Sequence, residues 1–79
     1  MILVGQDRRT AYNFDNVCDL YVFESRIVVT VGYEERKPLE STAGAYETPE
    51  RAMQVFNDLI NAIGEASVKP MGVVYLAED

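Results

Sequence analysis

Residues 44–64 read GAYETPERAMQVFNDLINAIG, and this stretch decides the fold of the 79-residue chain. Thr48 offers a side-chain oxygen to the free amides of a first helical turn, and Pro49 suits that turn because its missing N–H would have no partner there. Gly64 is typical of the residue that closes a helix. The spacing predicts an amphipathic helix over about residues 48–64. Its apolar residues recur at spacings of three and four: Ala52, Met53, Val55, Phe56, Leu59, Ile60, Ala62 and Ile63.

The rest of the chain consists of short apolar runs separated by polar turn sequences, which is typical of β-strands. Residues 17–23 and 27–33 are strongly β-prone, and the connection Glu24-Ser25-Arg26 joins them into a predicted hairpin. Further strands are expected at residues 1–4, 11–14, 39–46 and 71–77. We therefore expect a single α+β domain over residues 1–79, an antiparallel β-meander of about five to six strands with the helix packed on one face.

Both faces of the predicted sheet are rich in apolar residues, although one helix covers only one face. Continuous apolar runs are typical of strands that are covered on both sides. We therefore expect a second copy of the chain to cover the other face, which makes the protein a homodimer. The alternative is that the sheet curls and its own loops cover this face. The expected interface residues are Cys18, Leu20, Val22, Val28, Thr30, Val74 and Leu76.

The chain is strongly acidic. Thirteen acidic and seven basic residues give a formal net charge of −6. Such a surface repels phosphate backbones and anionic lipid, so we expect no binding to nucleic acid or to membranes. No apolar run approaches the roughly 20 residues that span a bilayer. The first residues do not have the pattern of a signal peptide, so a cytoplasmic location is expected.

The residue types that carry most enzyme chemistry are missing or isolated. The sequence has no histidine, which is the commonest general base and metal ligand. Cys18 is the single cysteine, and its place in a predicted strand is typical of a small buried hydrophobic residue. The carboxylate spacing matches no calcium loop, and the five glycines lie too far apart to form a phosphate loop. We expect neither catalysis nor a cofactor.

Three segments resemble a family of small uncharacterised proteins from Gram-positive bacteria and their phages and prophages. They are MILVGQD at residues 1–7, YNFDNV at residues 12–17 and GAYETPERA at residues 44–52. These segments are strand starts, turns and a helix cap. The resemblance implies a cytoplasmic protein of phage- or prophage-associated origin, and it transfers no catalytic or binding residue to this sequence.

Three functional hypotheses follow from these observations. The leading hypothesis is a non-catalytic protein-interaction module that self-associates through its sheet and binds a host or phage protein, because apolar surface is in surplus and catalytic chemistry is missing. The second is a small-ligand-binding or enzymatic domain that uses tyrosine and carboxylate side chains in a concave pocket. The third is an acidic nucleic-acid mimic, whose carboxylates would follow the spacing of phosphates.

Overall fold

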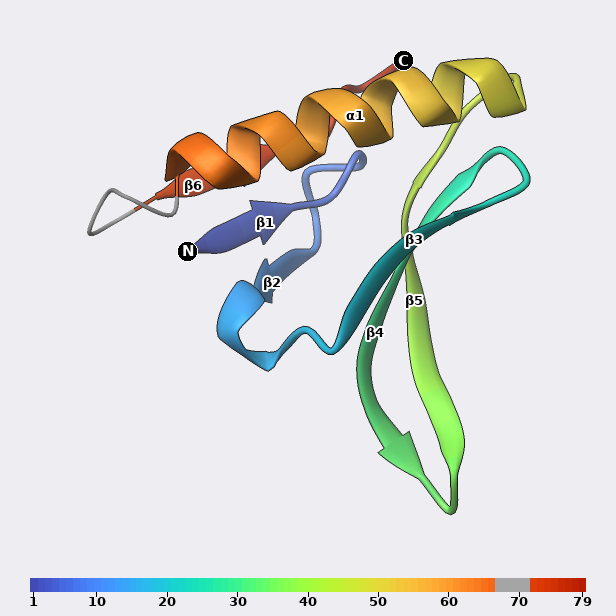
Figure 1. Ribbon diagram of the computed structural model, residues 1–79, viewed down its shortest axis with the longest axis vertical. Helices are drawn as coiled ribbons and strands as arrows, with labels where there is room; N and C mark the ends of the chain where they lie inside the picture. Colours follow the sequence, from blue (N-terminus) through green and yellow to red (C-terminus); the bar gives the residue numbers. More distant parts are fainter. Residues whose placement is uncertain (67–71) are drawn as a thin grey trace.

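The computed structural model describes residues 1–66 and 72–79 of the chain. Within these residues, six strands form two three-stranded sheets, and one α-helix packs against them (Figure 1). The predicted α+β class is confirmed, with the expected number of strands and one helix. The strands divide between two sheets, and the meander describes only the second of them.

The first sheet brings the beginning of the chain next to its last strand. Its order is β2 (Ala11–Asn13), β1 (Ile2–Val4) and β6 (Val73–Tyr75), with β1 in the centre. β1 pairs antiparallel with β2 and parallel with β6. A short 3-10 helix, η1 (Phe14–Asn16), follows β2. The parallel pairing of β1 with β6 is the part of this fold that a simple meander does not contain.

The second sheet is an antiparallel meander of β3 (Asp19–Phe23), β4 (Arg26–Glu34) and β5 (Lys37–Ala45). The β4–β5 hairpin extends away from the helix, and its tip is exposed (Figure 1). Glu35 and Arg36 form the tip with φ angles of 51° and 69°. Both angles lie in the left-handed region, which two-residue hairpin turns use because it matches the twist of the flanking strands.

The helix α1 (Pro49–Ala66) begins as the sequence predicts and ends two residues later than expected. The backbone N–H of Arg51 donates to Oγ1 of Thr48 at 3.1 Å, which confirms the predicted cap. The prediction that Gly64 closes the helix is wrong. A closing glycine needs a positive φ, and none of the described glycines has one. The helix therefore continues through Gly64 to Ala66.

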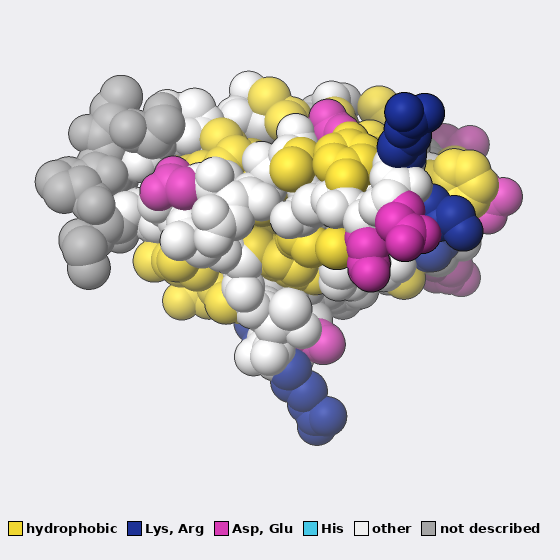
Figure 2. All heavy atoms as spheres, turned by 90° about the horizontal axis from the view of Figure 1, so that it is seen from below, with side chains coloured by type: hydrophobic (Ala, Val, Ile, Leu, Met, Phe, Trp, Pro, Cys, Tyr) yellow, Lys and Arg dark blue, Asp and Glu magenta, His cyan; other side chains and the backbone are white. Residues whose placement is uncertain are grey.

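One hydrophobic core lies between the helix and the two sheets. Its largest fully buried apolar side chains, Leu3, Ile27, Val29 and Leu76, come from both sheets. The helix contributes Ala52, Val55, Leu59 and Ala66. Met53 and Ile60 were expected on the buried face but remain 45% and 47% exposed. Figure 2 shows hydrophobic side chains that are exposed among acidic and basic ones on the face seen from below.

Candidate functional site

The residues predicted to form one interface lie on different faces of the second sheet. Leu20 and Val22 are half-buried and pack against the core on the helix side. Val28 and Thr30 are buried on the opposite side, where they pair across the strands with Tyr21 and Asp19. Because cross-strand partners share a face, the prediction that these four residues form one surface is wrong.

A one-residue difference in register explains this correction. The sequence predicts a three-residue connection over residues 24–26, whereas the structure has a two-residue turn in which Phe23 pairs with Arg26. Glu24 permits this tight turn by adopting a φ of 56°. Side chains alternate along a strand, so a slip of one residue moves each β4 side chain to the other face. Val28 and Thr30 therefore point away from the helix.

The other predicted interface residues also have unexpected surroundings. Cys18 is exposed, so the prediction that it is a buried hydrophobic residue is wrong. It lies one residue before β3, where its backbone N–H donates to the carbonyl of Thr30 at 2.8 Å. Val74 and Leu76 are buried in the core. An interface role therefore stays a prediction, and among these residues Leu20 and Val22 combine partial exposure with a place on an edge strand.

The side of the second sheet that faces away from the core carries aromatic and charged side chains, and we call it the outer face. Ile27 and Val29 belong to the core. Val28 lies between them in the sequence, so its side chain is on the opposite face of the sheet, where it is buried but is not part of the core. Phe23 and Tyr33 on the outer face are 49% and 58% exposed. The outer face comprises Asp19, Tyr21, Phe23, Arg26, Val28, Thr30, Tyr33, Glu40 and Thr42.

Two tyrosine–carboxylate pairs organise the outer face. The hydroxyl of Tyr33 donates to Oδ2 of Asp19 at 3.1 Å. The hydrogen-bonded carboxylate of Asp19 raises the pKa of Tyr33 above its ordinary value, because a neighbouring negative charge opposes ionisation of the phenol. Hydrogen bonding to Glu40, together with burial, raises the pKa of Tyr21 in the same way. The hydrogen bond between Tyr33 and Asp19 links β4 to β3, and the effect of Glu40 on the pKa of Tyr21 relates β5 to β3.

The outer face also holds one cation of its own. The guanidinium of Arg26 lies over the ring of Phe23, 5.3 Å from its centroid. Its Nη1 atom donates to Oγ1 of Thr42 at 3.3 Å. The edge of the sheet at β3 therefore already accommodates a guanidinium on an aromatic ring, a geometry that is favourable for cations within about 6 Å of the ring centroid.

We expect the stability of the protein to fall as the pH rises above 10. Tyr21, Tyr33 and Tyr46 have pKa values raised above the ordinary 10.0. The folded state therefore keeps phenolic protons that the unfolded state loses, so this contribution is full below pH 10 and disappears as the pH rises through the folded pKa values. Thermal unfolding followed across this range measures it, and Tyr33→Phe should weaken the dependence. A melting temperature that stays constant would contradict the prediction.

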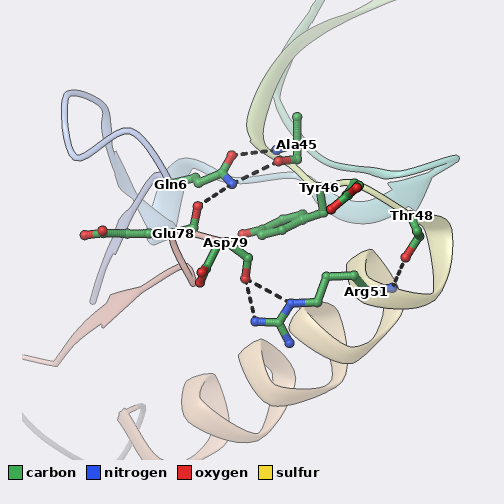
Figure 3. Close-up of a pocket in the computed structure, with 8 residues that line it drawn as sticks. Gln6, Ala45, Tyr46, Thr48, Arg51, Glu78 and Asp79 are labelled. Atoms are coloured by element: carbon green, nitrogen blue, oxygen red, sulfur yellow. Dashed lines mark hydrogen bonds between the residues drawn. The ribbon is translucent and has the colours of Figure 1, made fainter.

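A second feature is an open pocket of about 580 Å³ at the start of α1 (Figure 3). Glu78 and Asp79 line it. Four consecutive main-chain oxygens of residues 76–79 each accept a hydrogen bond from a different side chain. The donors are Arg8 Nη1 to Leu76 at 2.7 Å, Tyr46 Oη to Ala77 at 2.7 Å, Gln6 Nε2 to Glu78 at 2.9 Å, and Arg51 Nε and Nη2 to Asp79 at 2.9 and 2.6 Å.

These four donors fix the segment after β6 to the rest of the fold. Gln6 also exchanges two hydrogen bonds with the main chain of Ala45, so it connects the segment to β5. Arg8 adds an ion pair with Glu78 at 3.3 Å and lies over the ring of Tyr75, 5.2 Å from its centroid. The pocket therefore serves at least one structural purpose, because its polar side chains bind the main chain of the protein itself.

The sequence gives no signal for this arrangement. Gln6 and Arg8 bond residues 72 and 68 positions away, and Arg51 reaches across 28 positions. No local spacing predicts such pairs. The outer face is different, because the alternation of Asp19, Tyr21 and Phe23 places them together already in the sequence.

Comparisons of the chain with protein-family models, with curated proteins and with solved structures found no match. The resemblance to proteins of Gram-positive bacteria and phages stays a prediction. Within residues 1–66 and 72–79, no helix is both long and apolar enough to cross a membrane. The same residues contain no group of three or more cysteine or carboxylate side chains that could hold a metal ion.

Proposed function

We propose that this chain is a non-catalytic protein-interaction module that self-associates through the edge of β3. In this proposal it acts in the cytoplasm, and the dimer presents the outer faces of both copies to a host or phage protein. The observation that carries the proposal is that β3 is an edge strand without protection against pairing. An exposed edge presents unpaired N–H and C=O groups, which are a template for another strand.

The other three edges among the described strands are short or protected. β2 and β6 have only three residues each. β5 begins with Lys37 and Pro38 and has two irregularities in its register with β4. Gln6 covers the other end of β5, where its backbone N–H donates to the carbonyl of Ala43 at 2.8 Å. Short strands, lysine, proline and bulges are the usual devices against edge pairing.

β3 has none of these devices. Its five residues contain neither lysine nor proline, and its register with β4 is regular. Among the described strands β3 pairs only with β4, and each of its five residues is exposed or half-buried. We infer that a second strand can pair with this edge.

Partly exposed apolar side chains on β3 and on α1 support burial by a second copy. Leu20 and Val22 on β3 are half-buried. On the helix, Met53, Phe56 and Ile60 follow one another at spacings of three and four, so they share one side of α1. This is the side away from β6, because the hollow between α1 and β6 is lined by other helix residues, including Asp58 and Leu59. Covering such partly exposed groups gains roughly 25 cal/mol for each Å² of apolar surface.

The sequence of β3 fits antiparallel pairing with itself. A two-fold axis at Tyr21 places Leu20 opposite Val22 of the second copy, and both lie on the helix side. The same axis places Asp19 opposite Phe23 of the second copy, so the two carboxylates do not face each other. The resulting contact is isologous, which is the commonest symmetry of homodimers. It would join the two sheets into one of six strands.

Size-exclusion chromatography with light scattering tests this proposal at tens of micromolar protein, where a specific interface of standard size is occupied. We expect twice the 8.9 kDa mass of the single chain. Tyr21→Lys should give the single-chain mass, because two lysines would face each other at the two-fold axis, and like charges directly opposite are unfavourable. The side chain of Tyr21 lies on the outer face, so this change leaves the core intact.

The matched control is Tyr33→Lys, the same replacement on the same face but on the central strand β4. It should keep the mass of the dimer. A wild-type mass equal to that of one chain, or a Tyr21→Lys variant that remains dimeric, would overturn the proposal. Circular dichroism shows whether both variants stay folded.

A further inference from the structure

We propose that the outer face of the β3-β4-β5 sheet binds an extended segment rich in arginine and lysine from a partner protein. The inference goes beyond self-association, because the edge pairing described above leaves the outer faces of both copies free. It rests on three features of the outer face: exposed aromatic rings, paired carboxylates and a guanidinium that is already bound there.

The aromatic rings provide surfaces for cations. Among the aromatic residues of the outer face, Tyr33 and Phe23 are the most exposed, at 58% and 49%. Val28 lies on the same face, opposite Tyr21 and Thr42, and is only 3% exposed. Cations bind the faces of aromatic rings, and arginine does so more often than lysine. The contact of Arg26 with Phe23 shows this geometry within the chain itself.

The two carboxylates supply the charge that a cation requires. Asp19 accepts one hydrogen bond from Tyr33, and Glu40 acts on Tyr21 strongly enough to raise the pKa of its phenol. An ionised carboxylate has about four lone-pair positions, so each retains capacity for an incoming N–H donor. Both residues are exposed. The pairing with tyrosine holds each carboxylate beside an aromatic ring, where a guanidinium could contact the ring and the carboxylate together.

The charge of the whole chain favours the same partner. At a net charge of −6, long-range attraction concentrates cations around the protein and raises the rate of association with basic segments. Arg26 is the single basic residue on the outer face, and it is engaged with Phe23 and Thr42. A nucleic acid fits this face less well, although single strands also stack on aromatic rings, because Asp19 and Glu40 repel phosphates.

A blocked hexaarginine peptide serves as the probe, and isothermal titration calorimetry with the full chain measures its affinity. The charge test is the double variant Asp19→Asn/Glu40→Gln, which removes two charges and keeps a side-chain oxygen at each position, including the one that accepts from Tyr33. The matched control is Asp58→Asn/Glu65→Gln, which removes the same charge from the exposed surface of α1. We expect the first variant to weaken binding about tenfold and the control less than about twofold.

A third variant, Tyr33→Ala, leaves the net charge unchanged and tests the aromatic contribution. It should weaken binding of the peptide several-fold, and thermal unfolding should show that the fold is retained. Equal losses in the two charge variants would mean general electrostatic attraction and would overturn the proposal. No binding by the wild-type chain, or tighter binding of an oligothymidylate than of the peptide, would overturn it as well.

Discussion

Replacing Leu76 by alanine is expected to lower the free energy of unfolding by about 2–5 kcal/mol, the usual range for a buried leucine that leaves a cavity. Leu76 is 1% exposed in the core. Its backbone also connects distant parts of the chain, since its N–H donates to the carbonyl of Val4 at 3.0 Å and its carbonyl accepts from Arg8. A domain of 79 residues has a total stability of roughly 4–12 kcal/mol. The variant should therefore lose a large part of it.

Urea denaturation measures this loss, and Val73→Ala is the matched control. Val73 lies in β6 three residues earlier and is 49% exposed, so its truncation should change stability by less than about 0.5 kcal/mol. Both variants should be compared at one protein concentration, because self-association adds to apparent stability. Equal losses, or an effect of Leu76→Ala on association alone, would contradict the placement of Leu76 in the core.

The elements that sequence reasoning predicted well depend on interactions between neighbouring residues. Thr48 caps α1 through an amide three positions away, and the periodic apolar residues define the helix over most of its length. Gly44 and the small residues before it lower the strand preference of this segment, which is typical of a bulge or an edge strand. β5 is an edge strand, and its register with β4 shifts between Ile27 and Val28, next to Gly44. Such features need only local spacing and intrinsic preference.

The pairing of strands could not be predicted in the same way, because it depends on contacts between distant residues. The parallel contact of β1 with β6 joins residues 2–4 to residues 73–75, and several other edges would have fitted β6 equally well by hydrophobic pattern. The register between β3 and β4 depends on whether the connecting turn has two residues or three. A two-residue turn with Glu24 at positive φ is uncommon for a glutamate, so composition favours the longer connection.

This register is also why the candidate site was predicted only in part. The alternation of Asp19, Tyr21 and Phe23 correctly places them on one face. Their partners on β4 depend on the length of the connecting turn. The predicted register differs from the observed one by one residue, so it placed Val28 and Thr30 on the wrong face of the sheet. The binding partner of Tyr33 lies on another strand, and only the true register brings its hydroxyl to Asp19.

Two glycine-to-alanine replacements should change stability in opposite directions. At Gly72 an added Cβ would lie 2.6 Å from the main-chain oxygen of Ala66, and backbone atoms there have little freedom to move. The carbonyl of Gly72 also accepts a hydrogen bond from the N–H of Ile2 at 2.9 Å, so a displaced Gly72 would disturb the pairing of β1 with β6. We expect Gly72→Ala to lower stability by about 1–3 kcal/mol, the range for overpacking.

At Gly64 the same replacement should raise stability by about 0.5–1 kcal/mol. Gly64 lies within α1, where a Cβ would meet no described atom within 4 Å. Alanine is the better helix former, and it also restricts the unfolded chain. Thermal unfolding followed by circular dichroism should show both effects, at roughly 4–8 °C per kcal/mol for a domain of this size. Because both variants add the same methyl group, changes of equal sign would contradict the close contact between Gly72 and Ala66, the helical placement of Gly64, or both.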